Sequence, residues 1–265
     1  MSYTSQTNAT VDQASPMQDP HPNVAPSIHI SLYAYGGVSA ACLLSWISMA
    51  HAIATRPAQA ADIRTVREDA LISRSRSRAT KWFLDSGKDV WVQVDHDIEF
   101  DPSDIYRIAQ IAHDTGSTVC IPYSCRSLPP RPALRPKAEH LQTLKDMLSN
   151  ADGAPETVPI QMFASGCLAI PRRSLVAALE GLQSPKVDYP YRIDWCKDTL
   201  AGEFPTLWMP FAVDTLPNQL EYLSEDYAAA FRLSLCEVEH LAYRPSKPLS
   251  HWGEFPFAFH AYAPR

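Results

Sequence analysis

A strand-like pattern and a helix-like pattern follow one another near the start of the chain. Residues 28–33 (Ile-His-Ile-Ser-Leu-Tyr) place apolar side chains at every second position, which predicts a β-strand. The pair Gly36-Gly37 follows, and residues 38–54 then form an uncharged stretch that predicts a helix. Because glycines let a ligand approach the backbone, this strand, turn and helix form a candidate binding element.

The next segments repeat this alternation. Residues 62–67 predict a short strand or loop, and residues 71–84 predict a helix whose apolar face holds Leu71, Ala79, Phe83 and Leu84. Residues 90–95 (Val-Trp-Val-Gln-Val-Asp) predict a buried strand. Asp101 and Pro102 predict the start of a helix that runs to about Asp114 and stops at Gly116, and residues 118–122 predict another buried strand. Strands and helices at this spacing predict an α/β fold with a mostly parallel central sheet flanked by helices.

The second half of the chain is less regular. Residues 126–137 contain four basic residues, four prolines and no acidic residue, which predicts a stiff basic loop before a helix that starts near Ala138. Residues 159–170 predict a strand that contains Ala164-Ser165-Gly166, and residues 172–182 predict a helix. Residues 184–220 show no clear period, so we expect a long irregular insert of the kind that often carries binding residues.

Composition is that of an ordinary globular protein, with 20% charged and 46% hydrophobic residues among 265. The net charge of −6 and the pI near 5.8 argue against a generally basic nucleic-acid binder, but a local basic groove is still compatible with them. Six cysteines include no Cys-x-x-Cys pair. We therefore expect free thiols in a reducing compartment, with no zinc site and no disulfide framework.

The amino-terminal residues bear on location. Residues 1–26 contain four prolines and no Lys or Arg, so we expect a flexible tail without a secretory signal, followed by a domain over residues 27–265. Residues 28–55 contain no Lys, Arg, Asp or Glu, yet their polar residues and glycines leave no run of about 18 apolar residues. We therefore expect no transmembrane segment and a cytoplasmic protein, in the host cytoplasm if the protein is phage-encoded.

Two carboxylates stand where the strand at residues 90–95 ends. Side chains on a strand alternate between faces, so Asp95 and Asp97 are expected to face one way and His96 the other. In an open α/β sheet, ligands bind at the carboxyl ends of the strands, and paired carboxylates there suit Mg²⁺ or Mn²⁺ held against a diphosphate. A solvated turn rich in Asp is the alternative for so short a motif.

Three more polar groups are candidates, and each also has a purely structural explanation. The helix at residues 71–84 carries four cations, which form a solvated face unless a diphosphate lies nearby: Arg74, Arg76, Arg78 and Lys81. Ser224 predicts a helix N-cap followed by Glu225 and Asp226, which the helix dipole alone favours; facing Asp95, one of them could act as a general base. His251 is a single histidine and becomes a metal ligand only beside other ligands.

Taken in order, four motifs resemble the nucleotide-diphospho-sugar glycosyltransferases of the GT-A fold, in the glycosyltransferase-two-like group. They are residues 72–78 with Phe83-Leu84, residues 94–102, residues 164–173, and residues 222–227 paired with His251-Trp252-Gly253. The resemblance covers about residues 27–262. It implies a Rossmann-like single domain that moves a sugar from a nucleotide-diphosphate sugar, a UDP-sugar, to an acceptor hydroxyl with Mn²⁺ or Mg²⁺ bound.

The resemblance also implies roles for individual residues. Asp95 and Asp97 match the Asp-x-Asp pair, with Asp97 as the direct metal ligand and Asp95 near the ribose or the ion; His251 matches a late histidine that some members use as a further ligand. Asp226 matches the acidic base motif, with Glu225 in reserve. The remaining matches concern the donor: Tyr33 and Tyr35 at the nucleotide base, Arg76 at the donor, and Ser165 and Gly166 at the sugar. Ser77 replaces an Asn that often follows this Arg.

The acceptor is open at this stage. The layout is also similar to that of phage TET-associated glycosyltransferases, which modify hydroxymethylated cytosine in DNA, and the basic clusters at residues 74–81 and 126–137 could follow a phosphate backbone. Saccharide, lipid-linked and small-molecule acceptors are the alternatives. A nucleotidyltransferase and a binding module without activity are the rival classes.

Overall fold

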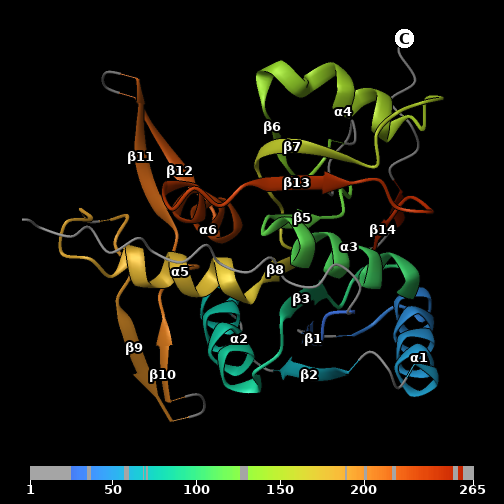
Figure 1. The fold of residues 1–265 in the computed structure, drawn as a ribbon, viewed down its shortest axis with the longest axis horizontal. Helices are drawn as coiled ribbons and strands as arrows, with labels where there is room; N and C mark the ends of the chain where they lie inside the picture. The colour runs from blue at the N-terminus through green and yellow to red at the C-terminus, as the bar shows by residue number, and fades with distance from the viewer. Residues whose placement is uncertain are drawn as a thin grey trace, which may run out of the picture.

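The computed structural model describes residues 25–34, 37–56, 60–67, 69, 71–125, 131–188, 190–199, 202–216, 219–252 and 256–258. One sheet organises the molecule (Figure 1). In spatial order its strands are β2 (Ala61–Arg67), β1 (Ile28–Ala34), β3 (Val90–Asp95), β8 (Cys167–Pro171), β5 (Thr118–Cys120), β13 (His240–Tyr243), β7 (Thr157–Met162) and β6 (Arg135–Pro136).

Most strands of this sheet run in the same direction. β1 pairs in parallel with β2 and β3, and β5 pairs in parallel with β13. β8 is antiparallel to both β3 and β5, and β7 is antiparallel to β13 and β6. Only β8 and β7 therefore oppose the other strands of the sheet, and the predicted α/β fold with a mostly parallel central sheet is confirmed.

Helices cover both faces of the sheet. They are α1 (Ala40–Thr55), α2 (Ile72–Ser86), α3 (Pro102–Thr115), α4 (Leu141–Leu148), preceded by the 3-10 turn η1 (Ala138–His140), α5 (Arg172–Leu182) and α6 (Glu225–Leu235). Asp101 caps α3 by accepting a hydrogen bond from the backbone N–H of Ser103 at 2.8 Å, and Gly116 ends it at a φ of 78°, as predicted. No helix in the described ranges has the length and apolar character needed to cross a membrane.

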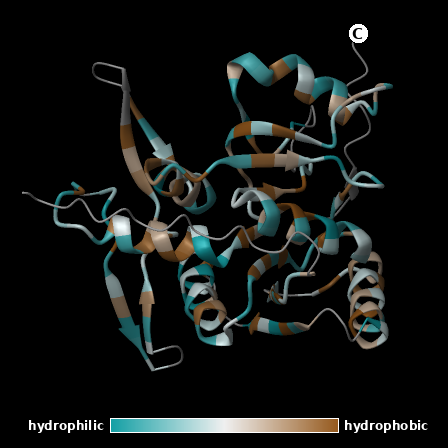
Figure 2. Ribbon diagram, in the orientation of Figure 1, coloured by the Kyte–Doolittle hydropathy of each residue, from teal (hydrophilic) through white to brown (hydrophobic). Residues whose placement is uncertain are grey.

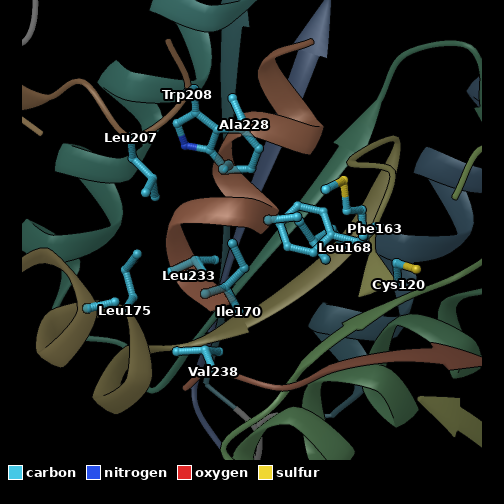
Figure 3. Close-up of a cluster of buried hydrophobic side chains, with 14 of the residues drawn as sticks. Cys120, Phe163, Leu168, Ile170, Leu175, Leu207, Trp208, Ala228, Leu233 and Val238 are labelled. Atoms are coloured by element: carbon cyan, nitrogen blue, oxygen red, sulfur yellow. The ribbon is translucent and has the colours of Figure 1, made fainter. Parts of the chain in front are cut away.

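The apolar residues form one core on each face of the sheet, because successive side chains of a strand alternate. Val90, Val92 and Val94 of β3 join α1 and α3 in one core, whereas Trp91 joins α2, α5 and α6 in the other. Figure 2 shows hydrophobic stretches along the strands, and Figure 3 shows the second core, where Trp208 and Phe163 lie near Leu233 of α6.

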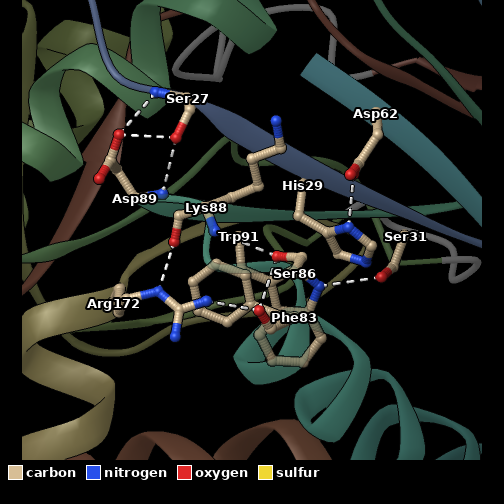
Figure 4. Close-up of polar contacts among 10 residues, drawn as sticks. All are labelled: Ser27, His29, Ser31, Asp62, Phe83, Ser86, Lys88, Asp89, Trp91 and Arg172. Atoms are coloured by element: carbon tan, nitrogen blue, oxygen red, sulfur yellow. Dashed lines mark hydrogen bonds and ion pairs between the residues drawn. The ribbon is translucent and has the colours of Figure 1, made fainter. Parts of the chain in front are cut away.

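Polar contacts tie the strand beginnings together on the edge opposite to the predicted site (Figure 4). The Ser27 hydroxyl donates to Asp89 at 2.7 Å, and Trp91 Nε1 donates to Ser31 at 3.0 Å. Arg172 donates to the carbonyl oxygens of Phe83 and Lys88, at 2.6 and 2.5 Å, and so joins the start of α5 to the end of α2. The carboxyl ends of the parallel strands lie at the opposite edge of the sheet.

Two predictions for the second half of the chain were wrong. Residues 159–170 form two strands, β7 and β8, because the chain leaves the sheet between Phe163 and Gly166 and re-enters it with β13 and β5 lying in between. Residues 184–220 are more ordered than expected. They contain the hairpin β9 (Trp195–Asp198)–β10 (Gly202–Pro205), and most of a second hairpin, β11 (Phe211–Leu216)–β12 (Gln219–Leu223), which both project from the body in Figure 1.

The predicted basic loop is also partly a strand. Residues 126–130 lie outside the described residues, but Arg135 and Pro136 form β6, paired with β7. Arg135 makes an ion pair with Glu221 of the second hairpin. A pattern dominated by proline conceals such a short edge strand, because only the partner strand supplies its order.

Candidate functional site

The carboxyl ends of β1, β3 and β5 meet at one edge of the sheet, next to the start of β8. The backbone N–H of Asp95 donates to the carbonyl of Gly166 at 2.9 Å, and that of His96 donates to the carbonyl of Tyr33 at 3.1 Å. A cavity of about 120 Å³ opens here. Its lining residues are Tyr33, Ala34, Val66, Asp69, Ile72, Ser75, Asp95, His96 and Asp97.

Asp95 and Asp97 line one cavity, as expected, but the expectation that His96 faces the other way was wrong, because β3 ends at Asp95 and residues 96–97 form a turn. The period of two applies only inside a strand, so His96 lines the same cavity as the two carboxylates. His96 Nδ1 also lies 3.1 Å from the carbonyl oxygen of Tyr33.

Asp95 is held by a buried arginine. Arg76 is 2% exposed, and its Nη2 donates to both carboxylate oxygens of Asp95 at 3.1 Å. The guanidinium lies over the ring of Tyr33, 4.7 Å from its centroid, and Tyr33 in turn donates its hydroxyl to Gln93 at 2.9 Å. Arg76 Nη1 points to the carbonyl oxygen of Ser165 at 3.5 Å. Tyr33 and Ser165 therefore hold the guanidinium of Arg76, which in turn holds Asp95.

Two of the four cations of α2, Arg76 and Arg78, do not belong to the solvated face that the sequence suggested, whereas Arg74 is exposed. Arg76 is buried, and Arg78 pairs with Asp69 and with Asp198 of the first hairpin. Arg74 also pairs with Asp69, whereas Leu71, expected on the apolar face, is 50% exposed. Burial of Arg76 and Arg78 follows from Asp95 and Asp198, carboxylates supplied by other elements, which helical periodicity cannot reveal.

Asp97 faces His251. Strand β4 (Ile98–Glu99) pairs with β14 (Ser250–Trp252), which itself pairs with β15 (Pro256–Ala258), and this pairing brings His251 Nε2 to 3.4 Å from Asp97 Oδ2. His251 Nδ1 lies 3.0 Å from the carbonyl oxygen of Ser124 and donates to it. In a neutral ring, Nε2 then presents a lone pair to a carboxylate oxygen. Such an arrangement suits a proton or a metal ion between the two atoms.

The acidic start of α6 belongs to the same region. Ser224 is the N-cap by position, but its hydroxyl donates to Asp226 and does not cap the backbone as expected. The N–H of Tyr227 donates to the same oxygen of Asp226, Oδ1, at 3.0 Å. Both carboxylates of this turn thus stand at the helix N-terminus, where the dipole favours negative charge.

Electrostatics links these carboxylates. Burial raises the pKa of Asp95, Arg76 opposes this shift, and Asp97 and Asp226 add to it. Burial also raises the pKa of Glu225, to which Asp226 adds and which Arg76 opposes. The four acidic groups therefore share one field, with Arg76 as the common cation.

Most residues singled out in the sequence lie together. The carbonyl oxygen of Gly166 accepts from the backbone N–H of Asp95, and that of Ser165 accepts from Arg76. Tyr35 and Gly253 lie outside the described residues. In the part of the chain that the structure describes, no three His, Cys, Asp or Glu side chains are placed to share a metal ion. Asp97 and His251 are accordingly a pair of ligand candidates that a substrate would have to complete.

Sequence reasoning missed Tyr123 and Ser124, which follow β5. Tyr123 packs edge to face against His251, with 5.2 Å between ring centroids, and Ser124 accepts the hydrogen bond of that histidine. Gln93, which bonds Tyr33, was also missed because it lies inside a buried strand. A search for polar residues after every predicted parallel strand would have found Tyr123 and Ser124.

No family model and no curated protein match this sequence. Among solved structures, the crystal structure of A197 from STIV is similar, with a TM-score of 0.47 and 13% identity over 86% of this chain and 86% of that chain. The crystal structure of a glycosyltransferase involved in the glycosylation of the major capsid of PBCV-1 has a TM-score of 0.31 and 8% identity, over 63% of this chain and 69% of that chain.

Proposed function

We propose that this protein is a metal-dependent glycosyltransferase that moves a sugar from a nucleotide-diphosphate sugar, a UDP-sugar, to an acceptor hydroxyl. The observation that carries the proposal is the pair Asp97 and His251, whose acceptor atoms face each other at 3.4 Å on the carboxyl edge of the sheet. Glu225 and Asp226 supply carboxylates in the same electrostatic field.

Asp97 Oδ2 and His251 Nε2 would hold Mn²⁺ or Mg²⁺, and the donor diphosphate would complete the ligand set. Such an ion supplies charge neutralisation to the departing nucleoside diphosphate. Asp95 has a different part in this proposal. Because Arg76 binds both of its oxygens, it serves as an oriented acceptor for a donor hydroxyl near the ion.

Asp226 is the proposed general base, with Glu225 in reserve. The Asp226 hydrogen bonds in the described part of the chain go to Oδ1, which leaves Oδ2 to take the proton of the attacking hydroxyl. A bond forms between the acceptor oxygen and the anomeric carbon while the bond from that carbon to the diphosphate breaks. In-line attack by this route inverts the anomeric centre.

Metal-dependent donor binding tests the proposal. We expect Mn²⁺ to be required for UDP binding in isothermal titration calorimetry, and Asp97→Ala or His251→Ala to weaken that binding at least tenfold by removing one of two protein ligands. His140→Ala and Asp146→Ala, partly exposed residues of η1 and α4, are matched controls. Unchanged affinity in both site variants would refute the metal site.

The sugar-transfer reaction tests the proposed general base. Asp226→Asn should abolish sugar transfer while UDP binding persists, because the amide cannot accept the proton. Normal turnover in Asp226→Asn with loss in Glu225→Gln would move the base to Glu225. Release of pyrophosphate from a triphosphate, with no release of a nucleoside diphosphate from a donor sugar, would favour the nucleotidyltransferase class.

The acceptor is best sought with a panel of hydroxyl compounds that includes hydroxymethylated and unmodified DNA. The pairing of Arg74, Arg78 and Arg135 with carboxylates reduces the positive charge available to a phosphate backbone, which weighs against DNA. Sugar incorporation into hydroxymethylated DNA alone would establish the DNA acceptor, and incorporation into a saccharide or lipid-linked hydroxyl would exclude it.

A further inference from the structure

Tyr123 lies between the two halves of the candidate site. It follows β5 and is 8% exposed, in the core on the side of α1 and α3. Burial raises the pKa of its hydroxyl, and the charges of Asp95 and Asp226 add to this shift. Burial of a phenol hydroxyl costs free energy unless its surroundings compensate, so the contacts of Tyr123 bear on its role.

On one side Tyr123 touches His251. The two rings meet edge to face, with an interplanar angle of 78° and 5.2 Å between centroids. The next residue, Ser124, accepts the hydrogen bond from His251 Nδ1 at 3.0 Å. Consecutive residues therefore fix the plane of the imidazole and the nitrogen that carries its proton, which together aim Nε2 at Asp97.

On the other side Tyr123 touches Gly166. A Cβ at position 166 would lie 2.7 Å from Cε1 and Cζ of Tyr123 and 2.8 Å from its hydroxyl oxygen. These distances are well below van der Waals contact, so the ring rests directly on the glycine. The carbonyl of Gly166 accepts the N–H of Asp95. A packed row thus runs from Asp95 through Gly166 and Tyr123 to His251.

We propose that Tyr123 is the positioning residue for His251, and that position 166 must be glycine because a side chain there would displace the Tyr123 ring that packs against the imidazole. The metal part of this inference rests on the proposed function. The orientation of the imidazole does not, since the contacts exist in the protein alone.

The first test uses the metal-free protein. Long-range ¹H–¹⁵N NMR of histidine side chains should report a single Nδ1–H tautomer for His251 in the wild type and in Tyr123→Phe, which keeps the ring. Tyr123→Ala should let the imidazole turn out of line with the Ser124 carbonyl, because the ring contact that fixes its plane is lost, and so give exchange between tautomers. A single Nδ1–H tautomer in Tyr123→Ala would overturn the proposal, whatever the protein binds.

The second test measures Mn²⁺ affinity by electron paramagnetic resonance. We expect Tyr123→Ala to raise the Kd about tenfold or more and Tyr123→Phe to change it less than twofold. Tyr106→Ala is the matched control, since Tyr106 is 6% exposed in the same core but not part of the site. Equal losses in Tyr106→Ala and Tyr123→Ala would reduce the effect to general destabilisation and contradict the proposal.

Gly166→Ala provides the third test. It should weaken Mn²⁺ binding although residue 166 is not a ligand, and it should add nothing in a Tyr123→Ala background, where the clash is absent. Gly181→Ala of α5 is its control, because a Cβ at that position would meet only the Cys236 sulfur, at 3.3 Å. Additive losses in the double variant would overturn the coupling. Absence of Mn²⁺ binding in a wild type whose His251 shows the single tautomer would refute the proposed function and leave the positioning intact.

Discussion

The ion pair between Arg76 and Asp95 sets the character of the site at the scale of single residues. Both groups leave water on folding, which costs several kcal/mol per ion unless geometry and hydrogen bonds compensate. The planar fork of arginine, the Tyr33 ring beneath it and the carbonyl of Ser165 provide that compensation. Nη2 contacts both oxygens of Asp95 while Nη1 reaches the carbonyl of Ser165, and the single nitrogen of an ammonium group cannot occupy both positions.

We expect Arg76→Met to lower the free energy of unfolding by about 3 kcal/mol, because it leaves the Asp95 carboxylate without its cation in a partly buried position. Urea denaturation measures this. The double variant Arg76→Met, Asp95→Asn should recover part of the loss, since no isolated charge remains. A single variant that loses less than about 1 kcal/mol would show that solvent already screens the pair.

Glu225 gives a prediction about the pH dependence of stability. Burial raises its pKa in the folded protein above the ordinary value of 4.5, so its contribution to stability is complete below that value and is lost as pH rises through the raised pKa. Glu225→Gln, which does not ionise, should therefore be more stable than the wild type at about pH 7, and the difference should vanish below about pH 4. Urea titrations at both pH values check this, and a difference that grows on acidification would contradict the raised pKa.

At the level of residues, the sequence indicated the acidic and histidine groups of the site but not their partners. Asp95 and Asp97 were found from their place at the end of a predicted strand and Asp226 from its place at a helix start. The resemblance added roles for them and for His251, and the structure brings the first two close to the others. The contacts of Arg76 and Tyr123 join segments that are far apart in the chain. No local pattern marks such a contact, because the partner's type and orientation are fixed only by the packed sheet.

Among the elements, β13 and α6 are joined by a buried histidine. His240 is 2% exposed, with its Nδ1 2.8 Å from the Thr118 hydroxyl and its Nε2 2.9 Å from the carbonyl oxygen of Ala230. The neutral ring accepts from Thr118 and donates to Ala230, so both nitrogens are satisfied without a charge. Burial lowers the pKa of His240 to about 4.

This shift predicts acid sensitivity. In the unfolded chain His240 takes up a proton near its ordinary pKa of 6.5, whereas in the folded protein it does so near 4. Its contribution to the free energy of unfolding is therefore complete above about pH 6.5 and is lost as pH falls towards 4. The total loss from this group is about 3 kcal/mol. We expect His240→Gln to flatten the pH dependence of urea unfolding in this window, and an equal slope in the variant would contradict a neutral buried ring.

The helices and strands predicted correctly are long enough to show several repeats of their hydrophobic pattern, and those predicted wrongly are not. The helices α1, α2 and α3 and the strands β1 and β3 matched their expected positions because each shows several repeats of its pattern. Residues 159–170 read as one apolar run, although β7 and β8 lie in different places in the sheet. The hairpins β9–β10 and β11–β12 were missed because their order comes from cross-strand pairs, which no single segment displays.

On the scale of the whole molecule, ligand binding should raise the free energy of unfolding. If Mn²⁺ and UDP bind the folded protein alone at about 100 times their Kd, they add about 2.7 kcal/mol and raise the Tm by roughly 5 to 10 °C. Differential scanning fluorimetry with and without EDTA measures the shift. Asp97→Ala should remove it, and a shift that survives both EDTA and this substitution would indicate binding elsewhere.

The position of β8 has a consequence for biosynthesis. β3 and β5 each pair with β8, which is made about fifty residues after β5 and separates the two strands. A nascent chain that has not yet released residues 167–171 from the ribosome therefore lacks the strand that joins its two halves, and the contacts that close the sheet are long-range and slow to form. The central sheet can therefore close only late in translation, when β8 has been made and pairs with β3 and β5, which are already present.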